Sequence, residues 1–152
     1  MRVKRIGTLK TYRKYEGVLV ELLPKYLAKS ECDDSVGDIL SHIRMECHNP
    51  FFISCVLLDD SEAVVGFVIA FVSITLQGKK IILEHMYAPN MGMSIKLYDM
   101  LVDKLGVEDV WWITHRDPAA WIKFTKKRSR PMKLHGWILR SDTEQFGQEK
   151  ED

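Results

Sequence analysis

The stretch ILEHMYAPNMGMSIKLYDML, residues 82–101, decides the fold because it joins a strand to a helix through a short loop. The residues before the loop are mostly apolar, as in a buried strand, and those after it place apolar side chains on one helical face. The loop itself carries Pro89, Asn90, Gly92 and Ser94 and almost no charge. Because the exposed amides at a helix N-terminus bind phosphate groups, we expect an anion-binding turn here.

On either side of this stretch the sequence alternates between strand and helix patterns. Pro24 falls inside the first predicted helix, where it removes a hydrogen bond, so we expect a kink or a restart there. Ser35 and Asp38 form the pattern of a capping box before the second predicted helix. The predicted strands cover residues 3–6, 51–58, 63–74, 80–87, 110–114 and 134–140, and the predicted helices cover residues 12–27, 36–47, 95–105 and 117–127.

The order of these elements, β-α-α-β-β-β-α-β-α-β, predicts the fold class. The strand–helix–strand crossover over residues 80–114 requires a parallel strand pair with a right-handed connection. The hairpins before it make the rest of the sheet antiparallel. We therefore expect an α/β (α+β) fold with a mixed, mostly antiparallel sheet, one parallel strand pair, and helices on both faces. We expect one domain over residues 1–140, followed by a polar, flexible tail over residues 141–152.

Composition and charge exclude several classes of function. The chain has 152 residues, 46% of them hydrophobic and 28% charged, as in an ordinary soluble domain. A net charge of +1 gives no overall attraction to nucleic acid or to a membrane. The three cysteines form no CxxC pair, so we expect reduced thiols in a cytoplasmic protein. Cys47, His48 and Cys55 lack a fourth ligand at a suitable spacing, so no metal site is expected.

The element order, with the quoted junction at its centre, resembles the GNAT acetyltransferase superfamily over residues 3–140. Residues 83–89, LEHMYAP, are similar to the family's strand that reads Ile-Glu-Asp-Leu-Tyr-Val-x-Pro. Residues 92–94, GMS, keep the small residues of the family's loop, Gln/Arg-x-x-Gly-x-Gly/Ala, whereas its Gln/Arg position falls on Pro89. In that family the amides of this loop wrap the pyrophosphate of acetyl-coenzyme A. The resemblance therefore implies acetyl-coenzyme A (acetyl-CoA) as the cofactor.

Two interpretations of the loop stay open. In a cofactor site, Gly92 lets the backbone approach a bulky anion and tolerates positive φ, while the Ser94 hydroxyl caps the helix or donates to phosphate. In an ordinary strand-to-helix turn, Ser94 serves only as the N-cap. The resemblance implies a larger set of cofactor-binding residues, namely Met86, Tyr87, Ala88, Asn90, Met91, Gly92, Met93, Ser94, Ile95, Phe124, Lys126 and Lys127.

Acetyl transfer to an amine calls for a general base. A lysine-like amine has a pKa of about 10.4, so at neutral pH almost all of it is protonated. Glu84 stands where the family often carries an acidic residue, and we expect it to remove this proton directly or through water. Otherwise Glu84 pairs with a neighbouring basic residue. Strand alternation places His85 on the opposite face. His115, at the end of the next strand, is the second candidate for the catalytic base, or else an ordinary strand-end histidine.

The acid side departs from the family pattern. Family members often read Asn-x-x-Ala-x-x-Phe-Tyr-x-Lys in the following helix, with the Tyr protonating the departing thiolate. Here residues 117–126 read DPAAWIKFTK, and Phe124 occupies the Tyr position. Because phenylalanine has no proton to donate, Thr125, Tyr87 or water must replace it, or the protein binds coenzyme A without efficient turnover.

A basic run, KFTKKRSRPMK at residues 123–133, contains six basic residues and no acidic ones. It is a solvated helix end, a contact of Lys126, Lys127 or Arg128 with the 3′-phosphate of coenzyme A, or a docking patch for nucleic acid or an acidic protein. Two functions therefore stay open: an N-acetyltransferase acting on a primary amine of a small molecule or protein, and a catalytically weak GNAT-like binding module. We expect no membrane partner, and a sheet edge shared between two copies would give a homodimer.

Overall fold

The computed structural model describes residues 1–30, 32–76, 78–106, 109–112, 119 and 122. The chain divides into two compact units, Met1–Arg116 and Asp117–Asp152. Nearly all of the described residues belong to the first unit, and Ala119 and Ile122 of the second have a helical backbone. The other residues of the predicted helix over 117–127, the predicted strand over 134–140 and the tail lie outside the described residues.

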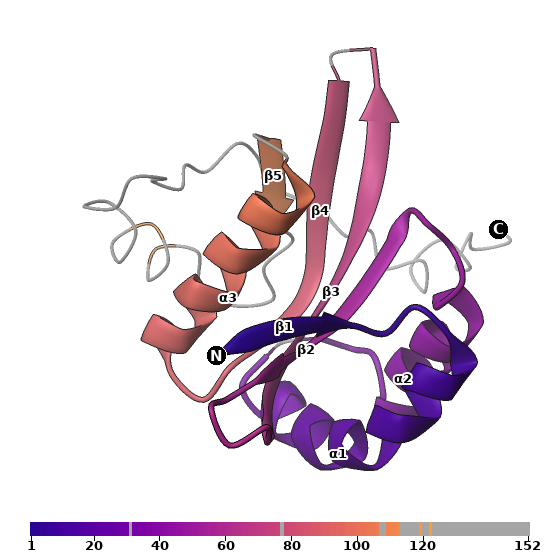
Figure 1. Ribbon diagram of the computed structural model, residues 1–152, viewed down its shortest axis with the longest axis vertical. Helices are drawn as coiled ribbons and strands as arrows, with labels where there is room; N and C mark the ends of the chain where they lie inside the picture. The colour runs from indigo at the N-terminus through magenta and orange to yellow at the C-terminus, as the bar shows by residue number, and fades with distance from the viewer. Residues whose placement is uncertain (31, 77, 107–108, 113–118, 120–121, 123–152) are drawn as a thin grey trace, which may run out of the picture. The chain divides into compact units, whose positions relative to one another are not determined.

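A mixed sheet of five strands runs through the described residues of the first unit (Figure 1). The strands lie in chain order, so that each pairs with the next one along the sequence. The first four pair antiparallel, and the fifth is parallel to the fourth. This arrangement confirms the predicted fold class, including the parallel pair made by the crossover. The strands are β1 (Arg2–Arg5), β2 (Phe52–Leu58), β3 (Val64–Thr75), β4 (Gly78–Tyr87) and β5 (Asp109–Trp112).

Helix α1 (Leu9–Leu27) starts at the N-cap Thr8, whose side chain accepts a hydrogen bond from the Thr11 amide. The helix runs continuously through Pro24, so the restart considered for this position does not occur. Proline removes one backbone hydrogen bond of a helix, but near the end of the helix this loss affects few other residues. The Ala28 amide donates to the Pro24 carbonyl at 2.9 Å and closes the last turn.

Helix α2 (Val36–Glu46) begins with the predicted capping box. The Asp38 amide donates to the Ser35 hydroxyl oxygen at 3.1 Å, and the Ser35 amide donates to the Asp38 carboxylate at 2.9 Å. The Ser35 hydroxyl also donates to that carboxylate at 2.6 Å, and these hydrogen bonds hold the pKa of Asp38 below its usual value. The start of α2 therefore carries its own bound negative charge.

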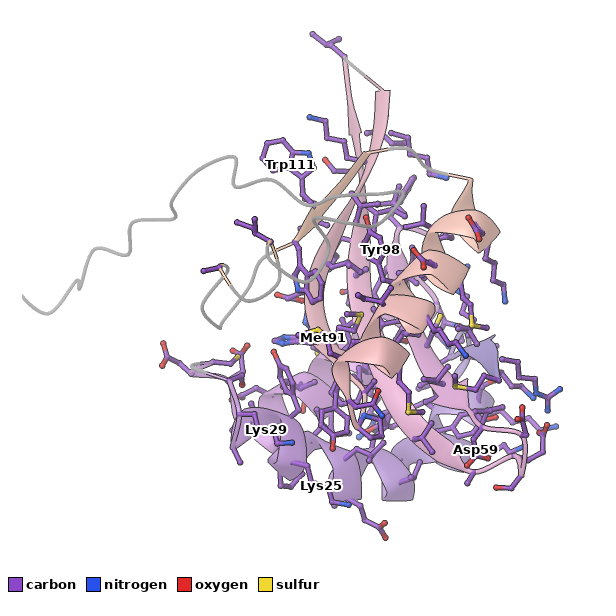
Figure 2. The ribbon with its side chains drawn as sticks, turned by 90° about the vertical axis from the view of Figure 1, so that its left-hand side faces the viewer. Lys25, Lys29, Asp59, Met91, Tyr98 and Trp111 are labelled. Atoms are coloured by element: carbon purple, nitrogen blue, oxygen red, sulfur yellow. The ribbon has the colours of Figure 1, made fainter. Side chains whose placement is uncertain are left out.

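Both of these helices pack on one face of the sheet and bury the main hydrophobic core against it (Figures 1 and 2). Gly66 of β3 meets the end of β4 here: a Cβ atom at this position would lie 2.5 Å from the Tyr87 carbonyl oxygen. Any side chain would therefore push the two strands apart. The core residues are Ile6, Tyr12, Tyr15, Leu19, Leu22, Leu23, Tyr26, Ile39, Ile43, Cys47, Phe52, Val56, Leu58, Phe67, Ile69 and Tyr87.

Helix α3 (Met91–Leu105) lies on the other face of the sheet and connects β4 to β5 (Figure 2, where Met91 marks its first turn). Its buried side chains include Leu97 and Leu101. Gly106 ends the helix in the left-handed conformation, with φ 59°, and its amide donates to the Val102 carbonyl. Within the described part of the chain, no helix is long and apolar enough to cross a membrane.

Candidate active site

A β-bulge in β4 determines how the acidic residue of this strand is presented. Ile69 of β3 lies opposite His85, and the next residue, Ala70, lies opposite Leu83, so Glu84 is an additional residue in the ladder. An inserted residue resets the alternation of side chains along a strand. As a result, the Glu84 carboxylate reaches to 3.9 Å from Nε2 of His85. The expectation that these two side chains serve opposite faces is therefore wrong.

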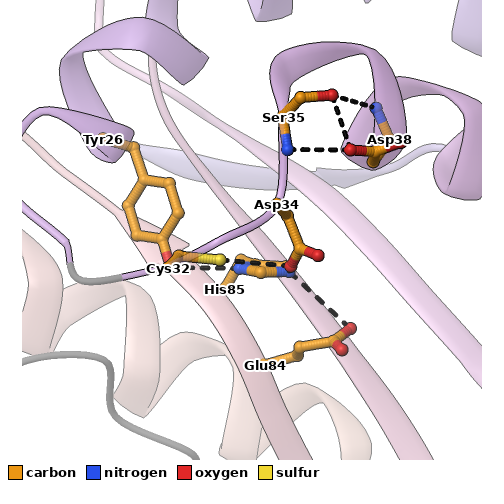
Figure 3. Close-up of polar contacts among 7 residues, drawn as sticks. All are labelled: Tyr26, Cys32, Asp34, Ser35, Asp38, Glu84 and His85. Atoms are coloured by element: carbon orange, nitrogen blue, oxygen red, sulfur yellow. Dashed lines mark hydrogen bonds and ion pairs between the residues drawn. The ribbon is translucent and has the colours of Figure 1, made fainter. Parts of the chain in front are cut away.

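His85 is buried, and both nitrogens of its imidazole ring lie near polar side chains (Figure 3). The Tyr26 hydroxyl, from α1, lies 3.0 Å from Nδ1. On the other side, Nε2 lies 3.6 Å from a carboxylate oxygen of Asp34, in the segment between α1 and α2. The tyrosine contact fixes the orientation of the ring, so that Nε2 faces the carboxylates of Asp34 and Glu84.

Cys32 lies in the same cluster. Its thiol donates a hydrogen bond to the Asp34 carboxylate, with 3.1 Å between Sγ and Oδ2. Burial, and then this hydrogen bond, raise the pKa of Cys32 to about 11, and the Glu84 charge acts in the same direction. The free thiol is therefore protonated at neutral pH, which excludes it as an activated thiolate nucleophile in this state.

Glu84 lies at the point on β4 where the described pairing with β5 ends. That parallel pairing runs from Lys80 opposite Asp109 to Leu83 opposite Trp112, and Glu84 is the next residue. The Glu84 side chain is 27% exposed, while its Oε2 atom is buried. A partly exposed carboxylate with one sheltered oxygen can accept a proton from a bound ligand.

The N-cap of α3 is Asn90. Its side-chain oxygen accepts a hydrogen bond from the Met93 amide at 3.0 Å. Its carbonyl accepts from both the amide and the hydroxyl of Ser94, at 3.0 and 3.2 Å. Ser94 is buried, so its hydroxyl belongs to the helix. The interpretation in which Ser94 is the N-cap is therefore wrong. The Ser94 hydroxyl already donates a hydrogen bond to the Asn90 carbonyl.

The fold itself makes little demand for glycine at position 92. Positive φ values among the described glycines occur at Gly78 and Gly106, so Gly92 does not need one. A Cβ atom on Gly92 would come within 4 Å of a single atom, Oδ1 of Asn90, at 3.4 Å. Within the described chain, no hydrogen bond occupies the amides of Met91 and Gly92. The first turn of α3 thus offers two backbone donors beside an exposed glycine.

The other predicted cofactor residues differ in exposure. Met86, Tyr87 and Ile95 are buried, and Ala88 is half-buried. The Tyr87 ring stacks on Phe67 with 6.0 Å between ring centroids, so it belongs to the hydrophobic core. The second candidate base, His115, and the predicted residues Phe124, Thr125, Lys126 and Lys127 lie outside the described residues.

Sequence patterns did not place Tyr26, Cys32 and Asp34 beside His85. Tyr26 falls in the apolar stripe of α1, and Asp34 is one of several acidic residues before α2 that could attract a cationic amine. Their meeting with His85 depends on the packing of α1 against β4, which no local pattern encodes. The one available signal was a cysteine two positions from an aspartate, beside a helix cap.

Solved structures share this fold. A ribosomal-protein-alanine N-acetyltransferase from Brucella melitensis biovar Abortus 2308 matches with a TM-score of 0.62 at 15% identity, covering 93% of this chain and 100% of the other. A predicted acetyltransferase from Clostridium acetobutylicum, with acetyl-CoA, matches with a TM-score of 0.62 at 12% identity, over 92% and 94%. An aminoglycoside acetyltransferase from an uncultured soil metagenomic sample, in complex with sisomicin, gives 0.59 at 12% identity, over 92% and 96%.

At these identities the likeness establishes the fold alone, and that fold is one found in acetyltransferases. No protein-family model and no curated protein sequence matches the chain.

Proposed function

We propose that this protein is an N-acetyltransferase that transfers an acetyl group from acetyl-CoA to a primary amine, as the GNAT resemblance implies. One observation carries the proposal: a carboxylate and a helix N-terminus with open amides follow each other on one strand–loop–helix unit. Glu84 lies near the end of β4, and Met91 and Gly92 begin α3. The fold shared with solved acetyltransferases supports the same assignment.

The first turn of α3 forms the cofactor-binding part of this site. Its open amides carry the partial positive charge of the helix N-terminus, roughly +0.5 of an elementary charge. Gly92 leaves the backbone accessible to a bulky group, and no acidic residue in this turn repels an anion. Acetyl-CoA supplies the acetyl group as a thioester, and its diphosphate is the anion that this helix end would hold.

Glu84 is the proposed general base. The acceptor ammonium first loses one proton, and the neutral amine nitrogen then forms a bond with the thioester carbonyl carbon. The carbon–sulfur bond breaks, coenzyme A leaves as its thiolate, and the second proton lost by the nitrogen reaches this thiolate through water. The Glu84 carboxylate accepts the first proton directly or through a water molecule. Asp34, which is 50% exposed, adds a second negative charge on the same side of His85 and favours a cationic acceptor.

Binding and chemistry are tested separately. Acetyl-CoA at about 100 times its dissociation constant should stabilise the fold by about 2.7 kcal/mol, measured as a thermal shift. Release of the coenzyme A thiol is then followed with a panel of small amines and lysine-containing peptides. Glu84→Gln should lower thiol release by about 10²–10⁴-fold and keep the thermal shift, because the amide cannot take up the proton.

Glu21→Gln, an exposed residue of α1, is the matched control and should change neither quantity. The absence of a thermal shift at millimolar acetyl-CoA would contradict the proposal. A thermal shift with unchanged thiol release in Glu84→Gln would reject the base alone. A thermal shift without thiol release from any amine would favour the binding module.

A further inference from the structure

The cluster in Figure 3 contains three chemically different metal-binding atoms. Sγ of Cys32, a carboxylate oxygen of Asp34 and an imidazole nitrogen of His85 all lie within 4.8 Å of one another. Two come from the segment before α2 and one from β4, so the fold brings together donors that are far apart in the sequence. The cysteine, histidine and aspartate do not form a charged surface patch, since His85 is buried and Cys32 is partly buried.

The distances suit a small tetrahedral ion. With zinc–sulfur bonds of about 2.3 Å and zinc–nitrogen or zinc–oxygen bonds of about 2.0–2.2 Å, neighbouring ligand atoms lie about 3.2–3.7 Å apart. Here Sγ of Cys32 and Oδ2 of Asp34 are 3.1 Å apart, and Oδ2 of Asp34 and Nε2 of His85 are 3.6 Å apart. The third pair, Sγ of Cys32 and the His85 ligand nitrogen, lies within 4.8 Å, so side-chain rotations would bring all three atoms around one ion.

The surroundings of His85 match those of a metal-binding histidine. Such residues usually have a hydrogen-bond partner on the ring nitrogen that does not touch the metal, which fixes the tautomer. The buried Tyr26 hydroxyl, 3.0 Å from Nδ1, is such a partner. It leaves Nε2 directed toward the Asp34 carboxylate, 3.6 Å away.

We propose that Cys32, Asp34 and His85 form a binding site for a zinc ion. Sulfur, imidazole nitrogen and one carboxylate oxygen together favour zinc over magnesium or calcium, which prefer oxygen ligands alone. The Glu84 carboxylate, 3.9 Å from Nε2 of His85, lies near the place that a fourth ligand of the zinc ion would take. Zinc at this position would draw Glu84 away from proton transfer. That consequence rests on the proposed function, whereas zinc binding does not.

The sequence-based expectation of no metal site concerned Cys47, His48 and Cys55, which are different residues from those of the proposed site. Cys47 and Cys55 are buried free thiols. Zinc binds the thiolate form of cysteine, so the Cys32 thiol must lose its proton when an ion binds at the proposed site. Binding therefore releases a proton into the buffer.

The test uses the full chain after treatment with a chelator. Zinc is titrated by calorimetry in two buffers of different ionisation enthalpy, which also reports the proton released. We expect one zinc ion per chain. Cobalt then replaces zinc as a spectroscopic probe. A bound thiolate should give a sulfur-to-cobalt charge-transfer band in the near ultraviolet, and tetrahedral cobalt should give intense visible bands.

Three variants assign the ligands. Cys32→Ser should abolish the charge-transfer band, and Asp34→Asn and His85→Gln should weaken zinc binding by at least about tenfold. Asp34 is half-exposed, so its variant tests the site even where loss of the buried His85 disturbs folding. Thermal unfolding of each metal-free variant checks that its fold is retained.

Cys47→Ala and His48→Gln are matched controls that remove a thiol and an imidazole outside the cluster. They should bind zinc and cobalt as the parent protein does. The proposal is overturned if no stoichiometric zinc or cobalt binds. It is equally overturned if the charge-transfer band persists in folded Cys32→Ser, or if only the control variants lose binding.

Discussion

The first turns of α2 and α3 share one layout but carry different kinds of residue at the fourth position. Residues 35–38, Ser-Val-Gly-Asp, and residues 90–93, Asn-Met-Gly-Met, each place the capping residue first and glycine third. In both, the side-chain oxygen of the cap accepts a hydrogen bond from the amide of the fourth residue, at 3.1 Å in α2 and 3.0 Å in α3.

The fourth residue decides what each helix start can bind. In α2 it is Asp38, whose carboxylate accepts a hydrogen bond from the Ser35 amide and places a negative charge at the helix N-terminus. In α3 it is Met93, and the first turn contains no acidic residue. The partial charge of α2 is therefore satisfied from within the chain, whereas that of α3 remains available to an external anion.

The largest effect is expected from Met93→Asp, which gives α3 the pattern of α2. The new carboxylate should raise the unfolding free energy by about 0.3–1 kcal/mol. It should also lower the affinity for acetyl-CoA by about 100-fold or more, because like charges at one site cost several kcal/mol. Calorimetry and urea unfolding measure the two quantities. Met93→Asn is the neutral control, and equal affinities in the two variants would contradict a diphosphate site here.

A smaller effect is expected from an added methyl group at the glycine. Gly92→Ala and Gly37→Ala occupy the same position in their helices, and the new Cβ would lie 3.4 Å from the Asn90 oxygen and 3.6 Å from the Ser35 oxygen. Both should gain roughly 0.5–1 kcal/mol of stability, as alanine does in helices.

Only Gly92→Ala should weaken acetyl-CoA binding, by about tenfold or 1.4 kcal/mol, because its methyl group lies where the ligand approaches. Equal affinities for both alanine variants would show that no ligand approaches Gly92.

The smallest effect concerns acid stability. Hydrogen bonds from Ser35 lower the pKa of Asp38 in the folded protein from its ordinary value of 3.8. A lowered folded-state pKa contributes stability above the unfolded-state value, and this is lost as the pH falls from about 3.8 through the folded-state value. The urea midpoint of the parent protein should therefore exceed that of Asp38→Asn at pH 6, and the two should converge below pH 3.8. A constant difference across this range would contradict the assignment.

The sequence predicts most of the described fold because its signals are local. Apolar periodicity marks the helices, and the Ser35–Asp38 pattern marks a helix start, since capping involves residues three apart. The crossover over residues 80–114 predicts the parallel pair, because a strand that returns through a helix must run in the same direction. Each of these features depends on neighbours in the chain.

The candidate site was harder to predict because it depends on pairing between strands and on packing between distant segments. No glycine or proline lies between Lys79 and Tyr87 to signal the bulge at Glu84, which is visible only against the register of β3. Likewise, the approach of Cys32 and Asp34 to His85 requires the position of the segment before α2. The family pattern indicates an acidic residue at the position of Glu84 but gives no information about the residues that contact it.

The bulge also determines which changes of chain length β4 can tolerate. Replacing Glu84 leaves the ladder intact, and deleting it would leave a regular ladder in which Leu83 and His85 keep their partners Ala70 and Ile69. Deleting a regularly paired residue such as Ile82 would instead shift the register by one residue, so that a buried side chain, Ile81 or Leu83, faced the wrong layer. A scan of single-residue deletions along residues 79–86 should therefore give a soluble deletion variant at Glu84 and an insoluble one at Ile82. Equal solubility of these two deletion variants would show that the strand can shift its register freely.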